Sequence, residues 1–324
     1  MAGKKSTGST STLQRCLQTV APLTLLIVLV LALHWQTHGT MITTQNLRNV
    51  VVRNIPLALI AIGETVIIIA GHIDLGVGSV MALAAVSGGL LVNHSVPFPL
   101  AVVIALGVGL ACGLVNGLVT TKAKMPSFVV TLAMMGLARG LALVVTDART
   151  VSGEFGFMGD LINRPVVGLP MGIWLLLLVA VVTHLLLAYT TFGRGIYALG
   201  ANTQAAHLSG IRTDRSLAWL FVLEGVLVGL AGLINMMQNA SAEPTMAGGI
   251  ELDAIAAVVI GGASLSGGQG SVGGTLVGVA IMAVLINGCN LLNVPNQWSK
   301  VIVAPLIVIA VLYDRWLKNK TRAA

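Results

Sequence analysis

The chain has 324 residues, of which 56% are hydrophobic and only 9% are charged, and its formal net charge is +7. A soluble domain contains about 25% charged residues, so this composition excludes a protein whose whole surface faces water. The long apolar runs indicate membrane-spanning helices rather than the short alternating strands of an outer-membrane barrel. We therefore expect an all-α, polytopic membrane protein that forms a single transmembrane domain over residues 1–324.

Ten apolar segments are candidate transmembrane helices. They cover residues 19–34, 55–70, 75–92, 99–121, 127–145, 167–188, 216–237, 253–265, 272–292 and 301–317. A hydrocarbon core of about 30 Å needs about 20 helical residues at 1.5 Å per residue. The eighth segment is too short for this, so it is predicted to use flanking residues or to be a broken or re-entrant element.

The distribution of basic residues predicts the orientation. With the N-terminus in the cytoplasm, twelve Lys and Arg residues lie on the cytoplasmic side and five on the opposite side, as the positive-inside rule requires. All five tryptophans lie at span ends, where the indole ring suits the headgroup layer. Both termini are therefore predicted to be cytoplasmic, and the first apolar run, which no small-residue cleavage site follows, is predicted to be an uncleaved span.

A glycine-rich turn separates the second and third spans. It reads GHIDLGVGS over residues 71–79 and places Asp74 in an apolar neighbourhood. Asp74 and Ser79 are able to cap the following helix. One interpretation is a bend that lines the transport pathway, since irregular backbone at membrane depth needs protein or a water-filled cavity around it. The other interpretation is a tight cytoplasmic turn with a helix cap.

The polar segment 191–215 contains a short helix of its own. Asn202 is predicted to be its N-cap, and Gly210 its left-handed stop, after which Ile211 packs back. Small Ala205 and Ala206 between them suit a helix that seats in a groove. A capped, surface-facing helix in the loop of a membrane protein indicates a docking point for a soluble partner.

A second glycine-rich region follows Glu251 and contains a formal G-x-G-x-x-G at Gly268, Gly270 and Gly273. No soluble βαβ unit surrounds it, so we reject a dinucleotide site and expect close helix packing and a sharp return instead. The chain has no Walker-type motif, so ATP is expected to bind a partner and not this chain. Its three cysteines have no ligand spacing. We expect no catalytic residue, cofactor or metal site in this chain, and no nucleic-acid partner.

Three charged residues lie inside predicted spans, namely Glu64, Arg139 and Glu224. Such charges usually face a partner or a cavity. Their depths predict a Glu64–Arg139 pair and leave Glu224 unpaired. Among the amides in or near spans, Asn116 and Asn287 are candidate pathway residues, because carboxamides hydrogen-bond sugar hydroxyls; they equally tie helices together.

These segments resemble the permease subunits of bacterial ABC importers for ribose, xylose, arabinose and galactosides. The family pattern G-G-I-D-L-S-V-G-S corresponds to residues 71–79, and F-G-R-x-x-Y-A-L-G-x-N-x-x-A-A-x-x-S-G-I to residues 192–211. The pattern E-L-D-A-I-A-A-V-V-x-G-G-x-S-L-x-G-G-x-G corresponds to residues 251–270. His72 and Gly76 depart from the first pattern, where the family usually has Gly and Ser.

The resemblance implies the ABC importer permease fold and a non-enzymatic transport subunit in the bacterial inner membrane that translocates a monosaccharide. It further implies a cytoplasmic ABC ATPase, a periplasmic sugar-binding protein and a second permease copy, either identical or a close paralogue. The segment that couples to the ATPase would contain Gly200, Asn202, Ala205, Ala206, Ser209, Gly210 and Ile211.

Two other function classes remain open from the sequence. An ion-gradient-driven secondary transporter of a small polar solute would use titrating intramembrane carboxylates, for which Glu64 and Glu224 are candidates. A scaffold or receptor would not transport at all. The sequence does not name the sugar.

Overall fold

The structure is a computed structural model that describes residues 9–153 and 156–295, together with residues 298, 301, 305 and 308. Helices make up most of the described chain. They are α1 (Ser9–Gln36), η1 (Thr40–Ile42), α2 (Thr44–Arg53), α3 (Ile55–Ile69), α4 (Val77–Asn93), α5 (Phe98–Lys122), α6 (Ser127–Val145), α7 (Gly156–Asn163), α8 (Met171–Tyr189), α9 (Thr191–Ala201), α10 (Thr203–Leu208), α11 (Thr213–Asn239), α12 (Ile250–Ile260) and α13 (Val272–Leu291).

Two short antiparallel ladders complete the described part. Strand β1 (Val151–Ser152) pairs with β4 (Ser241–Ala242), with Val151 opposite Ala242. Strands β2 (Pro165–Val166) and β3 (Leu169–Pro170) form a hairpin before α8. Strands β1, β2 and β4, with α2 and α7, occupy stretches for which the sequence predicted no regular structure. Strand β3 lies within the span predicted at 167–188, whose helix α8 begins only at Met171.

The all-α, multi-span architecture is confirmed. Helices α5, α6, α8, α11 and α13 are long and apolar enough to cross a membrane, and α2 with α3 makes a sixth if the pair, bent by 49°, counts as one span. Two shorter apolar helices, Ala21–Gln36 and α4, add to these. The predicted number of ten is not established, because the tenth span, 301–317, falls mainly outside the described residues.

Helices α5 and α11 cross at the centre of the molecule through small residues. A Cβ on Gly109 would collide with the carbonyl of Gly225, and a Cβ on Gly113 with the carbonyl of Phe221. Small residues let two helix backbones approach closely, which is how helices associate when lipid removes the hydrophobic driving force between them. Phe221 is fully buried beside this contact.

Two helices at the centre are too short to cross the membrane alone. Helix α3 has 15 residues, all buried, and α12 has 11, which is about 16 Å at 1.5 Å per residue. Both end in glycine-rich turns that lead into α4 and α13 respectively. The eighth segment is short in the structure, as its sequence indicated, and α3 shares this property. The broken or re-entrant course of the eighth segment stays a prediction.

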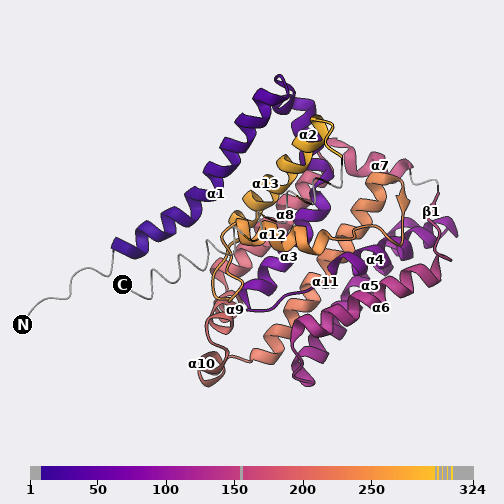
Figure 1. Cartoon of the computed structure of the whole chain (residues 1–324). Helices are drawn as coiled ribbons and strands as arrows, with labels where there is room; N and C mark the ends of the chain where they lie inside the picture. Colours follow the sequence, from indigo (N-terminus) through magenta and orange to yellow (C-terminus); the bar gives the residue numbers. More distant parts are fainter. Residues whose placement is uncertain are drawn as a thin grey trace, which may run out of the picture.

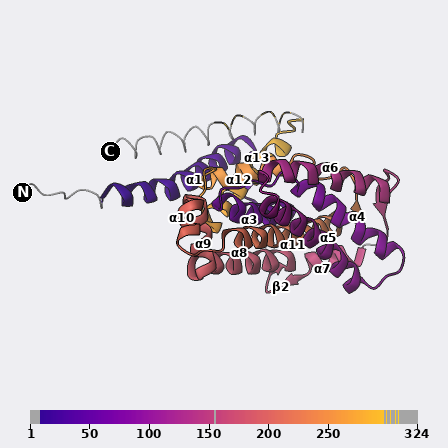
Figure 2. The same ribbon diagram turned by 90° about the horizontal axis from the view of Figure 1, so that it is seen from below.

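The two ends of the bundle differ. Figures 1 and 2 place α9 and α10 at one end and α7 at the other, and Figure 1 places α2 and β1 with α7. Helix α1 extends away from the bundle toward the N-terminus in both views. The other end of α1 packs against α13, where a Cβ on Gly288 would lie 2.5 Å from Cδ1 of Leu33.

Candidate functional site

Helices α9 and α10 form the polar segment between α8 and α11. The hydroxyl of Thr190 accepts a hydrogen bond from the N–H of Gly193 at 2.9 Å and so caps α9. Helix α10 begins after Asn202, whose Oδ1 accepts from the N–H of Ala205 at 3.0 Å. The predicted N-cap is confirmed, whereas α9 was not predicted, although Thr190 was an available N-cap signal.

The end of α10 has the predicted glycine stop. Gly210 has a φ of +84°, and its N–H donates to the carbonyl of His207 at 3.0 Å. The N–H of Ile211 donates to the carbonyl of Ala206 at 3.1 Å, which completes a Schellman motif. The Ile211 side chain lies against α9 beside Gly195, so the whole segment is held together by its own contacts.

The exposed face of α10 differs from the prediction, which placed both Ala205 and Ala206 on the surface that docks. Ala206 is buried at 3% exposure and faces its own chain, while Ala205 and Ser209 are exposed. Leu208 is 87% exposed at the end of the helix. Sequence reasoning did not single out Leu208, which is the one large apolar side chain of α10.

Asp74 organises the bend between α3 and α4. Its Oδ1 accepts from the N–H of Gly76 at 2.6 Å, and its Oδ2 accepts from Nδ2 of Asn116 at 3.2 Å. The N–H of Asp74 donates to Oε1 of Glu64 at 3.2 Å. All three side chains are buried, while Gly71, where the bend begins, is exposed. The pathway bend and the tight cytoplasmic turn both stay predictions.

The predicted helix cap is corrected by this geometry. The residue before α4 is Gly76, and no side chain caps that helix. Asp74 instead closes a local turn over its own backbone, two residues on, as Asp commonly does in turns. Ser79 lies buried in the first turn of α4.

The predicted Glu64–Arg139 pair is wrong. Glu64 of α3 lies beside Glu224 of α11, and the Asp74 carboxyl is close to both. Helix α11 comes this near because Gly63 leaves room for it: a Cβ there would lie 3.2 Å from Cγ of Glu224. Among the described residues, none makes a well-formed hydrogen bond to either carboxyl oxygen of Glu224.

Arg139 has a different role in the fold. Its guanidinium donates to the carbonyl of Pro244 at 2.5 Å and to that of Met246 at 3.0 Å, and the Glu251 carboxyl is near enough to interact with it. These groups belong to the segment that leads into α12. Arg139 therefore ties α6 to this segment rather than to α3.

Asn287 lies away from the bend. Its Nδ2 donates to Oδ1 of Asn46 at 3.1 Å, and Nδ2 of Asn46 donates to the carbonyl of Met41 at 2.9 Å. These contacts tie α13 to η1 and α2. The sequence left two roles open for the Asn287 amide, as a pathway residue or as a link between helices. The contacts in the structure are those of a link between helices.

The family model described as "Branched-chain amino acid transport system / permease component" matches residues 46–311. The chain belongs to this permease family. It is 40% identical over 277 residues to the ribose import permease protein RbsC of Escherichia coli (strain K12), covering 84% of this chain and 86% of that protein. It is 43% identical over 262 residues to RbsC of Bacillus subtilis (strain 168), covering 79% and 80%.

The xylose transport system permease protein XylH of Escherichia coli (strain K12) is 32% identical over 370 residues, covering 94% of this chain and 93% of that protein. No solved structure matches the chain. The permease is thus a transport component of the kind that the sequence patterns predicted. The relatives given above are all named as permease proteins of import or transport systems.

The permease brings its predicted site residues together in two places. The bend gathers Asp74 and Asn116 with Glu64 and Glu224, which the sequence had treated separately. The α9–α10 segment gathers six of the seven coupling residues around α10, while Gly200 lies in the last turn of α9 against other segments. Arg139 and Asn287 belong to neither place.

Proposed function

We propose that this permease is the membrane subunit of an ATP-driven importer of a monosaccharide, with a pentose such as ribose as its substrate. The observation that carries the proposal is the identity of 40–43% to ribose import permeases over about four fifths of each chain. The family description names branched-chain amino acids, so a competing amino-acid substrate belongs in the test.

The proposed assembly adds three components to this permease. A cytoplasmic ATPase binds ATP and docks on α10, a periplasmic binding protein delivers the sugar, and a second permease copy completes the pathway. The rigid, capped α10 and its exposed Leu208 support docking of the ATPase at that end of the bundle. The differential affinity that shifts the permease between inward-open and outward-open states resides in these partners.

The proposed location is the bacterial inner membrane, with both termini and α10 in the cytoplasm. The excess of Lys and Arg on that side supports this orientation. The bend at Asp74 and Asn116 is the proposed gate region, because it is irregular backbone around a buried carboxyl group and follows α3, which is too short to span alone.

The test is uptake of radiolabelled ribose by proteoliposomes that contain the permease with its ATPase and binding protein. We expect uptake that requires ATP inside, that excess unlabelled ribose abolishes and that leucine leaves unchanged. Leu208→Asp is expected to lose binding of the ATPase and uptake, because it places a charge at the apolar anchor, whereas the matched Leu208→Met retains both.

Ribose uptake by the permease alone, driven by a proton or sodium gradient, would favour secondary transport instead. ATP-dependent uptake of leucine and not ribose would retain the class of transporter and overturn the substrate.

A further inference from the structure

Three segments that are far apart in the sequence meet backbone to backbone beside α9. The N–H of Gly268, in the loop between α12 and α13, donates to the carbonyl of Ile69 at the end of α3, with an N···O distance of 2.8 Å. A Cβ on Gly200 in the last turn of α9 would collide with both of these atoms. The end of α9 therefore touches the α3–α4 bend and the α12–α13 loop at the same point.

Four glycines form this contact, which we call the glycine junction: Gly71, Gly200, Gly267 and Gly268. A Cβ on Gly267 would lie 2.7 Å from the carbonyl oxygen of Gly200 and 2.9 Å from Cα of Gly71. Gly71, Gly267 and Gly268 also have φ values of +82°, +80° and +75°. Because no side chain separates the three backbones, a displacement of one cannot be absorbed by a change of rotamer.

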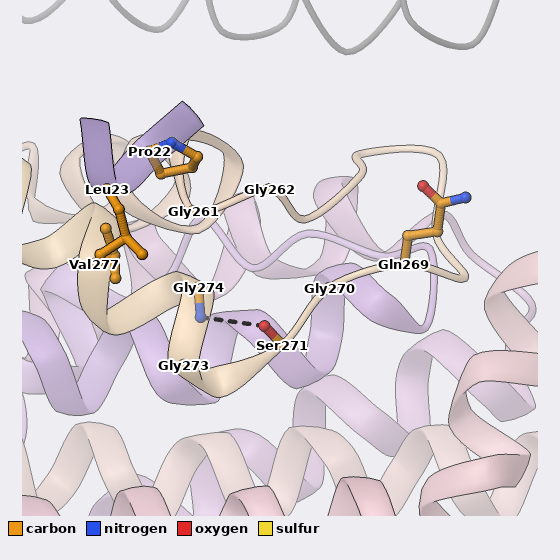
Figure 3. A pocket seen from close by; sticks show the side chains of 10 residues that line it. All are labelled: Pro22, Leu23, Gly261, Gly262, Gln269, Gly270, Ser271, Gly273, Gly274 and Val277. Carbon is orange, nitrogen blue, oxygen red and sulfur yellow. Dashed lines mark hydrogen bonds between the residues drawn. The ribbon is translucent and has the colours of Figure 1, made fainter. Parts of the chain in front are cut away.

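Tyr197 makes a second link from α9, one helical turn before Gly200. Its hydroxyl donates to the carbonyl of Gly270 at 2.9 Å. A tyrosine hydroxyl is protonated at neutral pH and is able to donate, and burial raises the pKa of Tyr197 further. Gly270 directly precedes Ser271, whose Oγ caps α13 by accepting from the N–H of Gly274 at 3.1 Å, as the dashed line in Figure 3 marks. Tyr197 thus holds the start of α13.

Helix α10 is firmly joined to α9. Asn202 ends α9 and caps α10, Ala206 is buried at 3% exposure, and Ile211 lies against α9 beside Gly195. A movement imposed on α10 is therefore a movement of α9 as well.

We propose that Tyr197 and Gly200 are positioning residues that transmit movement of α10 to the α3–α4 bend and to the start of α13 at the same time. This inference rests on the proposed function, because the movement originates in the ATPase. Gly200 transmits it by backbone contact to both loops, and Tyr197 by its hydrogen bond to the loop before α13. The two short helices α3 and α12, which pack against each other and end at these loops, then respond together.

The test compares Tyr197→Phe, which removes only the hydroxyl, with the matched Tyr189→Phe, whose side chain is 73% exposed at the end of α8. Hydrogen–deuterium exchange of the permease–ATPase complex is measured without nucleotide and after incubation with ATP and vanadate, which traps ADP and vanadate in the ATPase. In the wild type, we expect trapping to change exchange in both 69–76 and 261–271. Tyr197→Phe is expected to reduce the change in 261–271 at least about twofold.

Gly200→Ala is expected to reduce the change in both segments, because its Cβ displaces the contact, whereas Gly140→Ala, which meets no atom within 4 Å, retains the wild-type response. With ribose as the probe, Tyr197→Phe is also expected to import about threefold less sugar per ATP hydrolysed, with an ATPase rate close to that of the wild type. If Gly200→Ala fails to fold, Tyr197→Phe decides alone.

A wild-type response in Tyr197→Phe, or no response of either loop in the wild type, would overturn the inference. So would an increase in exchange that is equal with and without ATP, because it would indicate a merely structural hydrogen bond. Failure of the ATPase to bind would overturn both proposals. Since the exchange measurement involves no sugar, missing ribose uptake alongside an intact exchange response would overturn only the substrate.

Discussion

At the residue scale, the bend gathers three buried carboxyl groups that no sequence pattern had predicted to be neighbours. Glu64 and Glu224 are at most 1% exposed and Asp74 is 5% exposed. Asp74 has two donors to its side chain, from Gly76 and Asn116, while within the described chain Glu224 has no well-formed hydrogen bond. A buried polar group without a partner lowers stability, whereas a bonded one contributes to it.

Asp74 and Glu224 should therefore respond differently to mutation. Asp74→Ala leaves the N–H of Gly76 and the amide of Asn116 without their acceptor, and we expect it to destabilise the fold by about 1–3 kcal/mol. Glu224→Gln keeps the size of a side chain whose oxygens have no well-formed hydrogen bond within the described chain, and is expected to leave stability about unchanged. Thermal unfolding in detergent, followed by a thiol-reactive dye on Cys112 and buried Cys289, measures both. A strong loss of stability in Glu224→Gln would contradict this account.

At the scale of the elements, close approach of backbones fixes which helices are neighbours. Helices α5 and α11 meet through Gly109, Gly113 and Gly225, and α12 meets α13 through Gly261 and Gly274. In each pair the position of a Cβ would coincide with backbone atoms of the partner helix, so these glycines act by their lack of a side chain.

A methyl group added at such a contact should force the helices apart. Gly113→Ala places its Cβ against the carbonyl of Phe221 and is expected to destabilise the permease by about 1–3 kcal/mol. Gly107→Ala on the same helix meets no atom within 4 Å and is expected to be neutral or stabilising by about 1 kcal/mol, since Ala favours helix. Unfolding midpoints in detergent test this pair, and equal effects would argue against the α5–α11 contact.

At the scale of the whole molecule, the bundle has two unlike ends. One carries α9 and α10, and the other carries α7 with the neighbouring strands (Figures 1 and 2). The positive-inside rule predicts that the first end is cytoplasmic. Leu208 of α10 and Val167 of the hairpin before α8 are each 87% exposed, so they are equally accessible markers of the two ends.

Their accessibility from the two sides of the membrane tests the orientation. A membrane-impermeant maleimide should label Val167→Cys in cells whose outer membrane is permeabilised, and Leu208→Cys only in inverted inner-membrane vesicles. The unmodified permease serves as the background for its native thiols, of which Cys289 is buried and Cys112 half-buried. The reverse labelling pattern would invert the proposed topology and remove α10 from the ATPase.

Much of the local structure follows from the sequence. The span predicted at 127–145 coincides with α6, and the N-cap and glycine stop of α10 lie where predicted. Such features depend on residues within one or two turns of each other, through apolar length and terminal hydrogen bonds. Helix α2, with its 49° bend to α3, and helix α9 were not anticipated, because both are short and neither is apolar throughout.

The sequence by itself determined the class of this protein, a polytopic permease, since composition and span length depend only on the solvent that surrounds the chain. Tertiary structure alone decided which residues meet: Glu224 and not Arg139 lies beside Glu64, Ala206 faces inward, and Gly200 joins two distant loops. The physical reason is that a residue's position along a helix predicts its depth in the membrane but not which other helix it faces. Neighbours are set by the glycines at which two backbones fit together, and that fit depends on both helices at once.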